Sequence, residues 1–207
     1  MSKRRMTNKE FIEDRRLALQ ESNEHFSSAH KPERERWVVL EFLSNFNMPF
    51  EEVDIKSSSS EPPDVIYGDC LFEIKEILDP GRRRHDEFRQ KYEKALQAKH
   101  PRDLLEGYTP KDLSPAEIGN LVTEKLKEYE NHYPRAVRKG LDILFYVNLM
   151  EHFHKPGPVP NADMFEPYGW RSVSVLEGWR SIILFAAYTA PELLRSNIGV
   201  VHNRKFD

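Results

Sequence analysis

The stretch from Pro63 to Lys75 decides the fold and reads PDVIYGDCLFEIK. It contains one run rich in β-branched and aromatic residues, Asp64–Tyr67, and most of a second, Cys70–Leu78. Gly68-Asp69 separates the two runs. Runs of this kind are typical of strands, and a glycine-containing pair between them is typical of a two-residue hairpin turn. The stretch is therefore predicted to form an antiparallel β-hairpin.

The length of the turn fixes which side chains share a face of this hairpin. If Gly68 and Asp69 are the two turn residues, counting back along both strands places Asp64 opposite Glu73. Directly paired residues project from the same face, with Cβ atoms about 4.5–5.5 Å apart. Lys75 shares that face with Glu73 because strand side chains alternate. Two carboxylates that would otherwise repel each other are thus predicted beside a lysine.

This combination of groups suits metal-assisted cleavage of phosphodiesters. Mg²⁺ prefers oxygen ligands and is usually held by one or two carboxylates together with water and substrate phosphate. Asp64, Glu73 and the backbone carbonyl of Ile74 are the candidate ligands, with Mn²⁺ as an alternative to Mg²⁺. Such an ion lowers the pKa of a bound water, and Lys75 could polarise that water or stabilise developing negative charge.

Pro63-Asp64 followed by Glu73-Ile74-Lys75 resembles the signature of the P-D…(D/E)-x-K nuclease superfamily, which includes many restriction endonucleases. The resemblance covers roughly residues 33–149 and implies a restriction-endonuclease-like core of order αβββαβ. It also implies that Asp64 and Glu73 bind the metal, that Lys75 assists the water, and that the substrate is nucleic acid, DNA in preference to RNA. The chain also resembles an uncharacterised bacterial family to which endonuclease activity is ascribed without a mechanism.

Many members of the superfamily add a carboxylate from the helix before the first strand. Here that helix is predicted over Glu33–Phe46, and at 100° per residue its apolar side is centred near Val39 and Phe42. Glu35 falls inside this arc, whereas Glu41 points away from it. A carboxylate that faces the core needs a partner, so Glu35 is the candidate from this helix and Glu41 is second.

A basic stretch follows the hairpin directly. Its candidate nucleic-acid contacts are Arg82, Arg83, Arg84, Arg89 and Gln90. Arginines close to a cleavage site are natural phosphate contacts, and Gln90 also lies where superfamily members often place a polar catalytic helper. The alternative is a solvated helix start, in which neighbouring acidic residues partly cancel the charge.

The rest of the chain predicts an α/β protein with a central mixed sheet flanked by helices. Residues 1–30 are predicted to be a helical N-terminal extension that begins with a Thr7/Glu10 capping box, and residues 31–207 a single nuclease-like domain. Further helices are expected over 82–99 and 114–133, strands over 50–55, 141–149 and 182–188, and a hairpin that turns at Glu177-Gly178.

Two histidines offer an alternative centre. His152 and His154 stand at i, i+2, so they could share one face of a strand and bind zinc, with His132 available as a third ligand. Surface histidines near a loop are the alternative interpretation. Trp170 and Trp179 could stack on bases, although packing in the core or in a hairpin is the commoner role of such residues.

Composition limits these hypotheses. Charged residues make up 31% and hydrophobic residues 39% of the 207 residues, and the formal net charge is −3. The whole molecule therefore does not attract a polyanion, and nucleic-acid binding must rest on local patches. Cys70 is the only cysteine, which excludes an intrachain disulfide and a cysteine-rich zinc site.

The same composition bears on location and partners. The most apolar stretches are too short to cross a bilayer, so a soluble cytoplasmic protein without membrane association is expected. Two questions stay open: whether the chain forms a homo-oligomer or a subunit of a larger complex, and whether the fold is a catalytically silent nucleic-acid-binding or interaction module.

Overall fold

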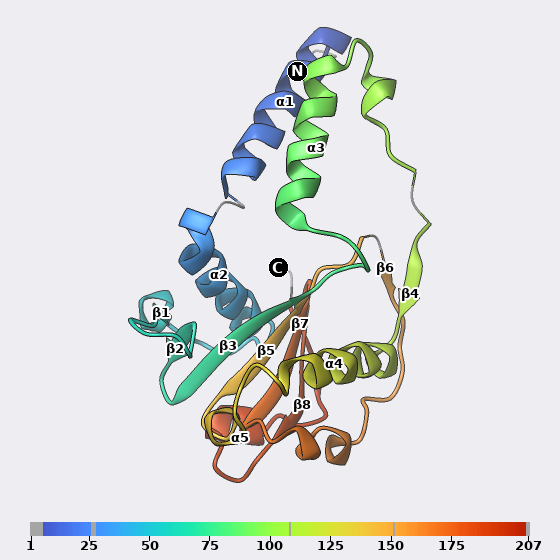
Figure 1. Cartoon of the computed structure of the whole chain (residues 1–207). Coiled ribbons are helices and arrows are strands. Elements are labelled where there is room, and N and C mark those ends of the chain that lie inside the picture. The colour runs from blue at the N-terminus through green and yellow to red at the C-terminus, as the bar shows by residue number, and fades with distance from the viewer. Residues whose placement is uncertain (1–5, 26–27, 108, 151, 206–207) are drawn as a thin grey trace. The chain divides into compact units, whose positions relative to one another are not determined.

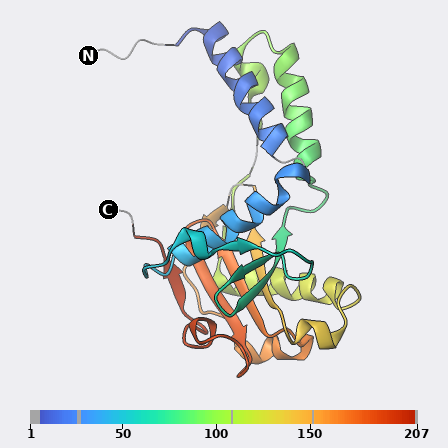
Figure 2. The same cartoon turned by 90° about the vertical axis from the view of Figure 1, so that its left-hand side faces the viewer.

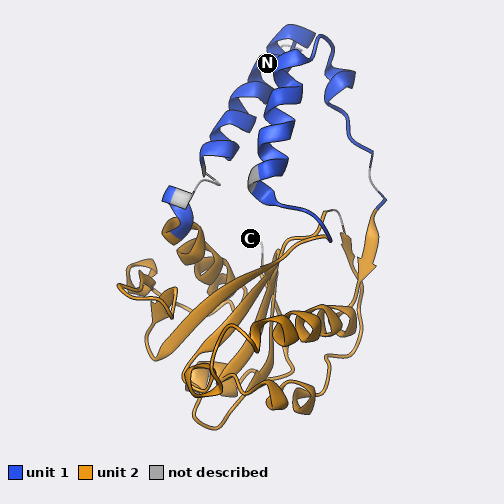
Figure 3. Ribbon diagram, in the orientation of Figure 1, with its two compact units in different colours: residues 1–31, 80–109 blue, residues 32–79, 110–207 orange. Residues whose placement is uncertain are grey.

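The computed structural model describes residues 6–25, 28–107, 109–150 and 152–205. The chain divides into two compact units, Met1–Lys31 with Pro80–Thr109 and Pro32–Asp79 with Pro110–Asp207 (Figure 3). We predicted a boundary near residue 30 and one domain after it. In the structure, Pro80–Thr109 groups with the N-terminal residues, and the second unit is built from two separate segments. The predicted domain division stays a prediction.

The first unit is helical. Its elements are α1 (Asn8–His25), η1 (Ser28–His30), α3 (Arg84–Gln97) and η3 (Pro101–Leu104). Thr7 and Glu10 form the predicted reciprocal bonds at the start of α1, with Glu10 N–H donating to Thr7 Oγ1 over 3.2 Å and Thr7 N–H to Glu10 Oε2 over 2.8 Å. Arg16 of α1 donates to the Ala95 and Leu96 carbonyls at 2.8 and 3.0 Å. These bonds join α1 to carbonyls at the end of α3, where the helix leaves backbone acceptors only partly satisfied.

The second unit is built on a seven-stranded mixed sheet of order β1-β2-β3-β5-β7-β8-β9 (Figures 1 and 2). Its strands are β1 (Lys56–Ser57), β2 (Val65–Tyr67), β3 (Cys70–Ile77), β5 (Asp142–Val147), β7 (Ser172–Glu177), β8 (Arg180–Ala186) and β9 (Val201–Asn203). β3, β5 and β7 run parallel, and antiparallel strands extend the sheet on both sides. β4 (Lys111–Leu113) and β6 (His152–His154) form a second, two-stranded sheet.

Helices cover both faces of the large sheet. The helical elements are α2 (Lys31–Ser44), η2 (Glu52–Asp54), α4 (Pro115–Tyr129), α5 (Arg135–Arg138), η4 (Ala162–Met164), η5 (Glu166–Tyr168) and α6 (Glu192–Arg195). Val39 and Phe42 of α2 pack with Phe72 and other residues of one face, whereas Val122 of α4 packs with Ile143 and other residues of the opposite face. The predicted α/β class, with a mixed sheet between helices, is confirmed.

Most predicted elements form, with one clear exception. The helix predicted over Glu33–Phe46 is α2, and the one predicted from Ser114 is α4, which begins with a Ser114/Glu117 capping box. The strand predicted over Phe50–Ile55 is wrong, since Glu52–Asp54 is a 3₁₀ turn and only Lys56–Ser57 pairs in the sheet. Val53 is 76% exposed whereas Ile55 is buried, so the apolar residues of this segment do not share one buried face.

Among the described residues, no helix is long and apolar enough to cross a membrane.

Candidate active site

The β2–β3 hairpin has the predicted register. Tyr67 pairs with Cys70 and Val65 with Phe72, and Gly68 in the turn takes a φ of 53°, a conformation that favours glycine. Asp64 lies directly before β2, and its N–H donates to the Phe72 carbonyl at 3.0 Å. Asp64 is therefore bonded to β3 at Phe72, and its direct pairing with Glu73 stays a prediction.

Asp64 is held against β3 by its side chain as well. Its Oδ2 accepts a hydrogen bond from the Ile74 N–H at 2.8 Å, and the residue is only 5% exposed. The carboxylate is thus fixed beside the segment that carries Glu73, Ile74 and Lys75. A buried carboxylate is tolerated only with such partners, and this one is bound to the backbone of the predicted metal-binding segment.

Glu73 and Lys75 form a tight cluster with Tyr133. Lys75 Nζ lies 2.5 Å from Glu73 Oε1, and Tyr133 Oη donates to the same oxygen at 2.5 Å. Lys75 Nζ also lies 5.6 and 5.5 Å from the ring centroids of Tyr129 and Tyr133, within the range of a cation–π contact. The cluster is enclosed on the α4 side of the sheet, with Glu73 only 3% exposed.

One oxygen of this cluster stands out. Glu73 Oε2 is buried and has no hydrogen-bond partner, although Oε1 accepts two charge-assisted or short bonds. An unpaired buried carboxylate oxygen is costly, because desolvation of a polar group without a partner costs about 1–3 kcal/mol. A cation that approaches Oε2 would remove this cost. The donor set of Asp64, Glu73 and the Ile74 carbonyl contains only oxygen, which fits Mg²⁺ or Mn²⁺.

The surroundings keep Lys75 charged. Burial alone would lower the pKa of Lys75, but hydrogen bonds and charge interactions with Glu73 and Tyr133 outweigh it, so the pKa of Lys75 is raised. Burial and the hydrogen bond to Glu73 raise the pKa of Tyr133, which therefore stays a donor. Lys75 can accordingly act as a fixed cation, and it is poorly suited to accept a proton from water.

Glu35 belongs to α2, one turn before Val39. The apolar residues of α2 pack on the sheet face that carries Phe72 and Ile74, whereas Glu73 and Lys75 project toward the end of α4. A role for Glu35 in the site stays a prediction.

The predicted arginine cluster lies in the first unit. Arg82 pairs with Glu87 at 2.6 Å and Arg89 with Asp86 at 3.1 Å, while Arg83 caps α3 and Arg84 begins it. Gln90 is exposed on the same helix. Two of the predicted phosphate contacts are therefore engaged in local ion pairs, and their role in nucleic-acid binding stays a prediction.

A basic pocket of about 740 Å³ lies within the second unit. Arg135, Lys139 and Arg171 line it together with Trp170, whose ring contacts that of Tyr133 at a centroid distance of 5.4 Å. Arg171 also pairs with the buried carboxylate of Asp142. Because Tyr133 binds Glu73, this pocket adjoins the carboxylate cluster within one unit.

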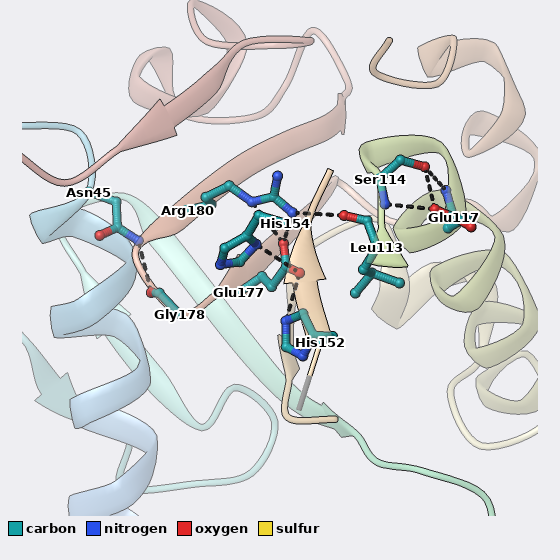
Figure 4. Close-up of polar contacts among 9 residues, drawn as sticks. All are labelled: Asn45, Leu113, Ser114, Glu117, His152, His154, Glu177, Gly178 and Arg180. Atoms are coloured by element: carbon teal, nitrogen blue, oxygen red, sulfur yellow. Dashed lines mark hydrogen bonds and ion pairs between the residues drawn. The ribbon is translucent and has the colours of Figure 1, made fainter. Parts of the chain in front are cut away.

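The two histidines meet a partner that the sequence did not indicate. His152 Nε2 lies 2.9 Å and His154 Nδ1 3.2 Å from Glu177 Oε1 (Figure 4). Glu177 is completely buried at the end of β7. Arg180 binds the other carboxylate oxygen through Nε at 2.9 Å and also through Nη2. The expected third ligand, His132, instead lies beside the Glu128 carbonyl, with its Nδ1 at 2.9 Å.

The pKa values of the two imidazoles are shifted in opposite directions. The close contact with the Glu177 carboxylate, and the negative charge of that group, outweigh burial and raise the pKa of His152. Burial dominates at His154 and lowers its pKa. Proximity to one carboxylate thus acts unequally on two neighbouring rings.

Sequence reasoning missed Tyr129, Tyr133 and Glu177. The two tyrosines stand at i, i+4 at the end of a helix, a spacing that does not differ from that of ordinary core contacts. Glu177 was visible only as a turn residue. Its contact with His152 depends on the parallel pairing of β5 with β7, which no local pattern encodes.

None of the curated proteins matches the chain. A solved structure of a protein of unknown function from Pseudomonas aeruginosa strain PAO1, described as of the monooxygenase superfamily, matches with a TM-score of 0.64 and 27% sequence identity. The match covers 98% of this chain and 97% of that one.

A family model matches residues 7–206, nearly the whole chain. Its description is "Putative endonuclease, protein of unknown function (DUF1780)". The predicted likeness to a family of ascribed endonucleases is confirmed, whereas membership of the P-D…(D/E)-x-K superfamily stays a prediction. The chain belongs to this family.

Proposed function

We propose that this protein is an endonuclease that hydrolyses phosphodiester bonds of nucleic acid, DNA in preference to RNA, with Mg²⁺ or Mn²⁺ at Asp64, Glu73 and the Ile74 carbonyl. The observation that carries the proposal is the buried Glu73 carboxylate. One of its oxygens is held by Lys75 and Tyr133 and the other has no hydrogen-bond partner. The description of the family as an endonuclease supports the same reaction.

Each residue of the site has a definite part in this reaction. A bound divalent ion would supply charge neutralisation at the phosphate and a more acidic water. Asp64 and Glu73 would supply carboxylate oxygens to the ion. The Ile74 N–H fixes the first carboxylate, and Tyr133 orients the second. Lys75 remains protonated and stabilises the negative charge that develops on the phosphate oxygens in the transition state.

We infer that the basic pocket binds the substrate beside this site. Among the described residues, no carboxylate pairs with Arg135 or Lys139, and both side chains are exposed. Neutralising phosphates with such cations supplies most of the sequence-independent affinity for nucleic acid. The pocket therefore offers a local positive patch despite a net charge of −3.

The description of the Pseudomonas aeruginosa protein points to another class of reaction. Three oxygen donors beside a lysine suit Mg²⁺ rather than an oxygen-activating ion. Hydrolysis is therefore the reaction that the Asp64–Glu73–Lys75 cluster supports. An oxygen electrode with the purified protein would reveal an oxygenase by its uptake of dioxygen.

Cleavage of plasmid and of DNA and RNA oligonucleotides, with Mg²⁺, Mn²⁺ or EDTA, tests the proposal. We expect metal-dependent cleavage that falls about 10²–10³-fold in Lys75→Ala, the usual loss when one stabilising donor is removed. Lys127→Ala, an exposed lysine on α4, is the matched control and should cleave normally. If the purified protein cleaves nothing, or if Lys75→Ala changes nothing, the proposal fails.

The alternative is a silent module that binds nucleic acid with the same fold. It differs from the enzyme in one measurable way, since it would retard DNA in a gel without cutting it at any Mg²⁺ or Mn²⁺ concentration. Unchanged DNA binding in Glu73→Gln together with absent cleavage in the unmodified chain would establish this alternative.

A further inference from the structure

We propose that His152, His154 and Glu177 form a second metal centre, separate from the carboxylate cluster, that binds a divalent transition-metal ion. The group lies at the carboxyl end of the central parallel strands, where β7 ends, and β5 separates β7 from β3 in the sheet. Ligands of open α/β sheets commonly bind at this end of the strands. The inference does not rest on the proposed nuclease activity.

The spacing of the three donor atoms matches that of ligands around one ion. The three donor atoms all lie within 4.8 Å of one another. Glu177 Oε1 is 2.9 Å from His152 Nε2 and 3.2 Å from His154 Nδ1. Ligand atoms at about 2.0–2.1 Å from a shared zinc ion would be separated by roughly 3.0–3.4 Å. A small movement of the side chains would therefore admit an ion between them.

Glu177 Oε1 is a buried oxygen without a satisfactory partner. The side chain has no exposed surface, and although two histidine nitrogens are close, neither forms a hydrogen bond of acceptable geometry with Oε1. Nδ1 of His154 is likewise buried without a hydrogen bond. Polar atoms that converge at ion-pair distance without forming hydrogen bonds are atoms that a bound cation would satisfy.

Surrounding residues hold the carboxylate in a ligand-like orientation. Arg180 occupies Oε2 and also donates to the Leu113 carbonyl at 3.3 Å, so Oε1 is the oxygen that faces the histidines (Figure 4). Asn45 donates to the Gly178 carbonyl at 3.4 Å, beside Glu177. Such outer contacts orient metal ligands in known sites and strongly affect metal affinity.

The donor types select the class of metal. Two imidazoles and a carboxylate suit Zn²⁺, Fe²⁺, Co²⁺ or Mn²⁺, whereas Mg²⁺ and Ca²⁺ prefer oxygen ligands throughout. Three protein ligands also leave at least one coordination position for water or another small ligand, as in catalytic rather than structural zinc sites. The centre is therefore chemically distinct from the all-oxygen cluster around Glu73.

Metal binding by the full chain, purified without a histidine tag and stripped with EDTA, tests the inference directly. Calorimetric titration with Zn²⁺ and the visible spectrum with Co²⁺ should each show one equivalent bound to this centre per chain. His154→Ala and His152→Ala should each weaken Zn²⁺ binding at least about tenfold, a loss typical of damaged metal sites. His132→Ala, an exposed histidine outside the group, is the matched control and should bind normally.

Further measurements keep the test decisive. Circular dichroism establishes that each variant is folded, and if one histidine variant does not fold, the other still decides the outcome. Glu73→Gln should retain the Co²⁺ spectrum, so the failure of the nuclease proposal leaves this result unaffected. Absence of stoichiometric binding, or binding that is equal in His154→Ala and the unmodified chain, would show an ion pair of His152 with Glu177 only and overturn the inference.

Discussion

Two clusters of polar residues can be compared, one around Glu73 and Lys75 and one around Glu177. Both are built on the same face of the large sheet, but the chain assembles them differently. The first comes from a single hairpin of 63–75 with Tyr133 added from beyond α4. The second joins β6 of the small sheet to the end of β7 of the large one. A local turn thus determines one site, and the tertiary topology determines the other.

The two regions also satisfy their buried carboxylates in different ways. Glu73 is balanced by a lysine that keeps a partly exposed side chain, whereas Glu177 is balanced by an arginine that is itself buried. Arginine is the usual choice for fully desolvated pairs because its planar group forms two parallel bonds. This contrast makes Arg180 mainly a structural partner, while Lys75 remains available to a substrate.

The largest expected effect is on stability at the second site. Arg180→Ala leaves the carboxylate of Glu177 buried without its cation, and breaking such a pair typically costs about 3–5 kcal/mol. Unfolding in urea measures the loss of free energy of unfolding. Arg195→Ala, which removes an exposed pair with Glu192, should cost at most about 1 kcal/mol.

Zn²⁺ sharpens this prediction. A cation bound at Glu177 Oε1 would compensate part of the lost positive charge. Zn²⁺ should therefore raise the urea midpoint of unfolding of Arg180→Ala more than that of the unmodified chain. A loss for Arg180→Ala no greater than that for Arg195→Ala would show that Glu177 does not depend on its arginine.

A smaller effect is expected at the first site. Tyr133→Phe removes only the hydroxyl that donates to Glu73 at 2.5 Å, while the ring keeps its contact with Trp170. A hydrogen bond to a charged group contributes roughly 1.5–3 kcal/mol, and the free energy of unfolding should fall by about this amount. Tyr188→Phe, at an 89% exposed position, should leave stability unchanged, and an equal result for both variants would contradict the assigned role of Tyr133.

The same contrast explains what could be read from the sequence. The hairpin register, the capping box at Thr7 and the helix start at Ser114 follow from neighbours within a few residues. Glu177 could not be recognised as a histidine partner because its place beside β6 depends on how distant strands pair. Two serines of β7, Ser172 and Ser174, are buried although they interrupt its apolar pattern.

The division into units was also beyond local patterns. The helix over Arg84–Gln97 follows the hairpin directly in the chain. In the structure it packs with α1 in the first unit, where Ala95 is buried and Arg16 of α1 binds its carbonyl. The narrow apolar side of a charged helix predicts that the helix packs against another element. It does not identify that element.

Nucleic-acid affinity should respond modestly to the basic pocket. The double variant Arg135→Ala/Lys139→Ala should weaken DNA binding and reduce the slope of log affinity against log salt by about 2, since each lost phosphate contact removes about 0.9. Fluorescence anisotropy between 50 and 200 mM salt, roughly the range over which such contacts are resolved, measures both quantities. An unchanged slope would direct attention to the arginines at 82–84 of the first unit, which the equivalent variants there would test.

The smallest expected effect is the response of cleavage to the titration of Lys75. Its pKa is raised in the folded protein, so its stabilising contact with Glu73 is fully present below the pKa of a free lysine, about 10.4. The contact is lost only as pH rises through the higher folded value. The pH–rate profile at saturating Mg²⁺ should therefore show no limb from this residue between roughly pH 6 and 9.

A base at this position would behave otherwise, because it would have to lose its proton within that range. Lys75→Arg separates the two roles, since arginine stays protonated and supplies a cation but no base. Partial cleavage by Lys75→Arg with an unchanged pH profile is the expected result. A rising limb in the unmodified chain that disappears in Lys75→Arg would show instead that Lys75 takes a proton from the attacking water.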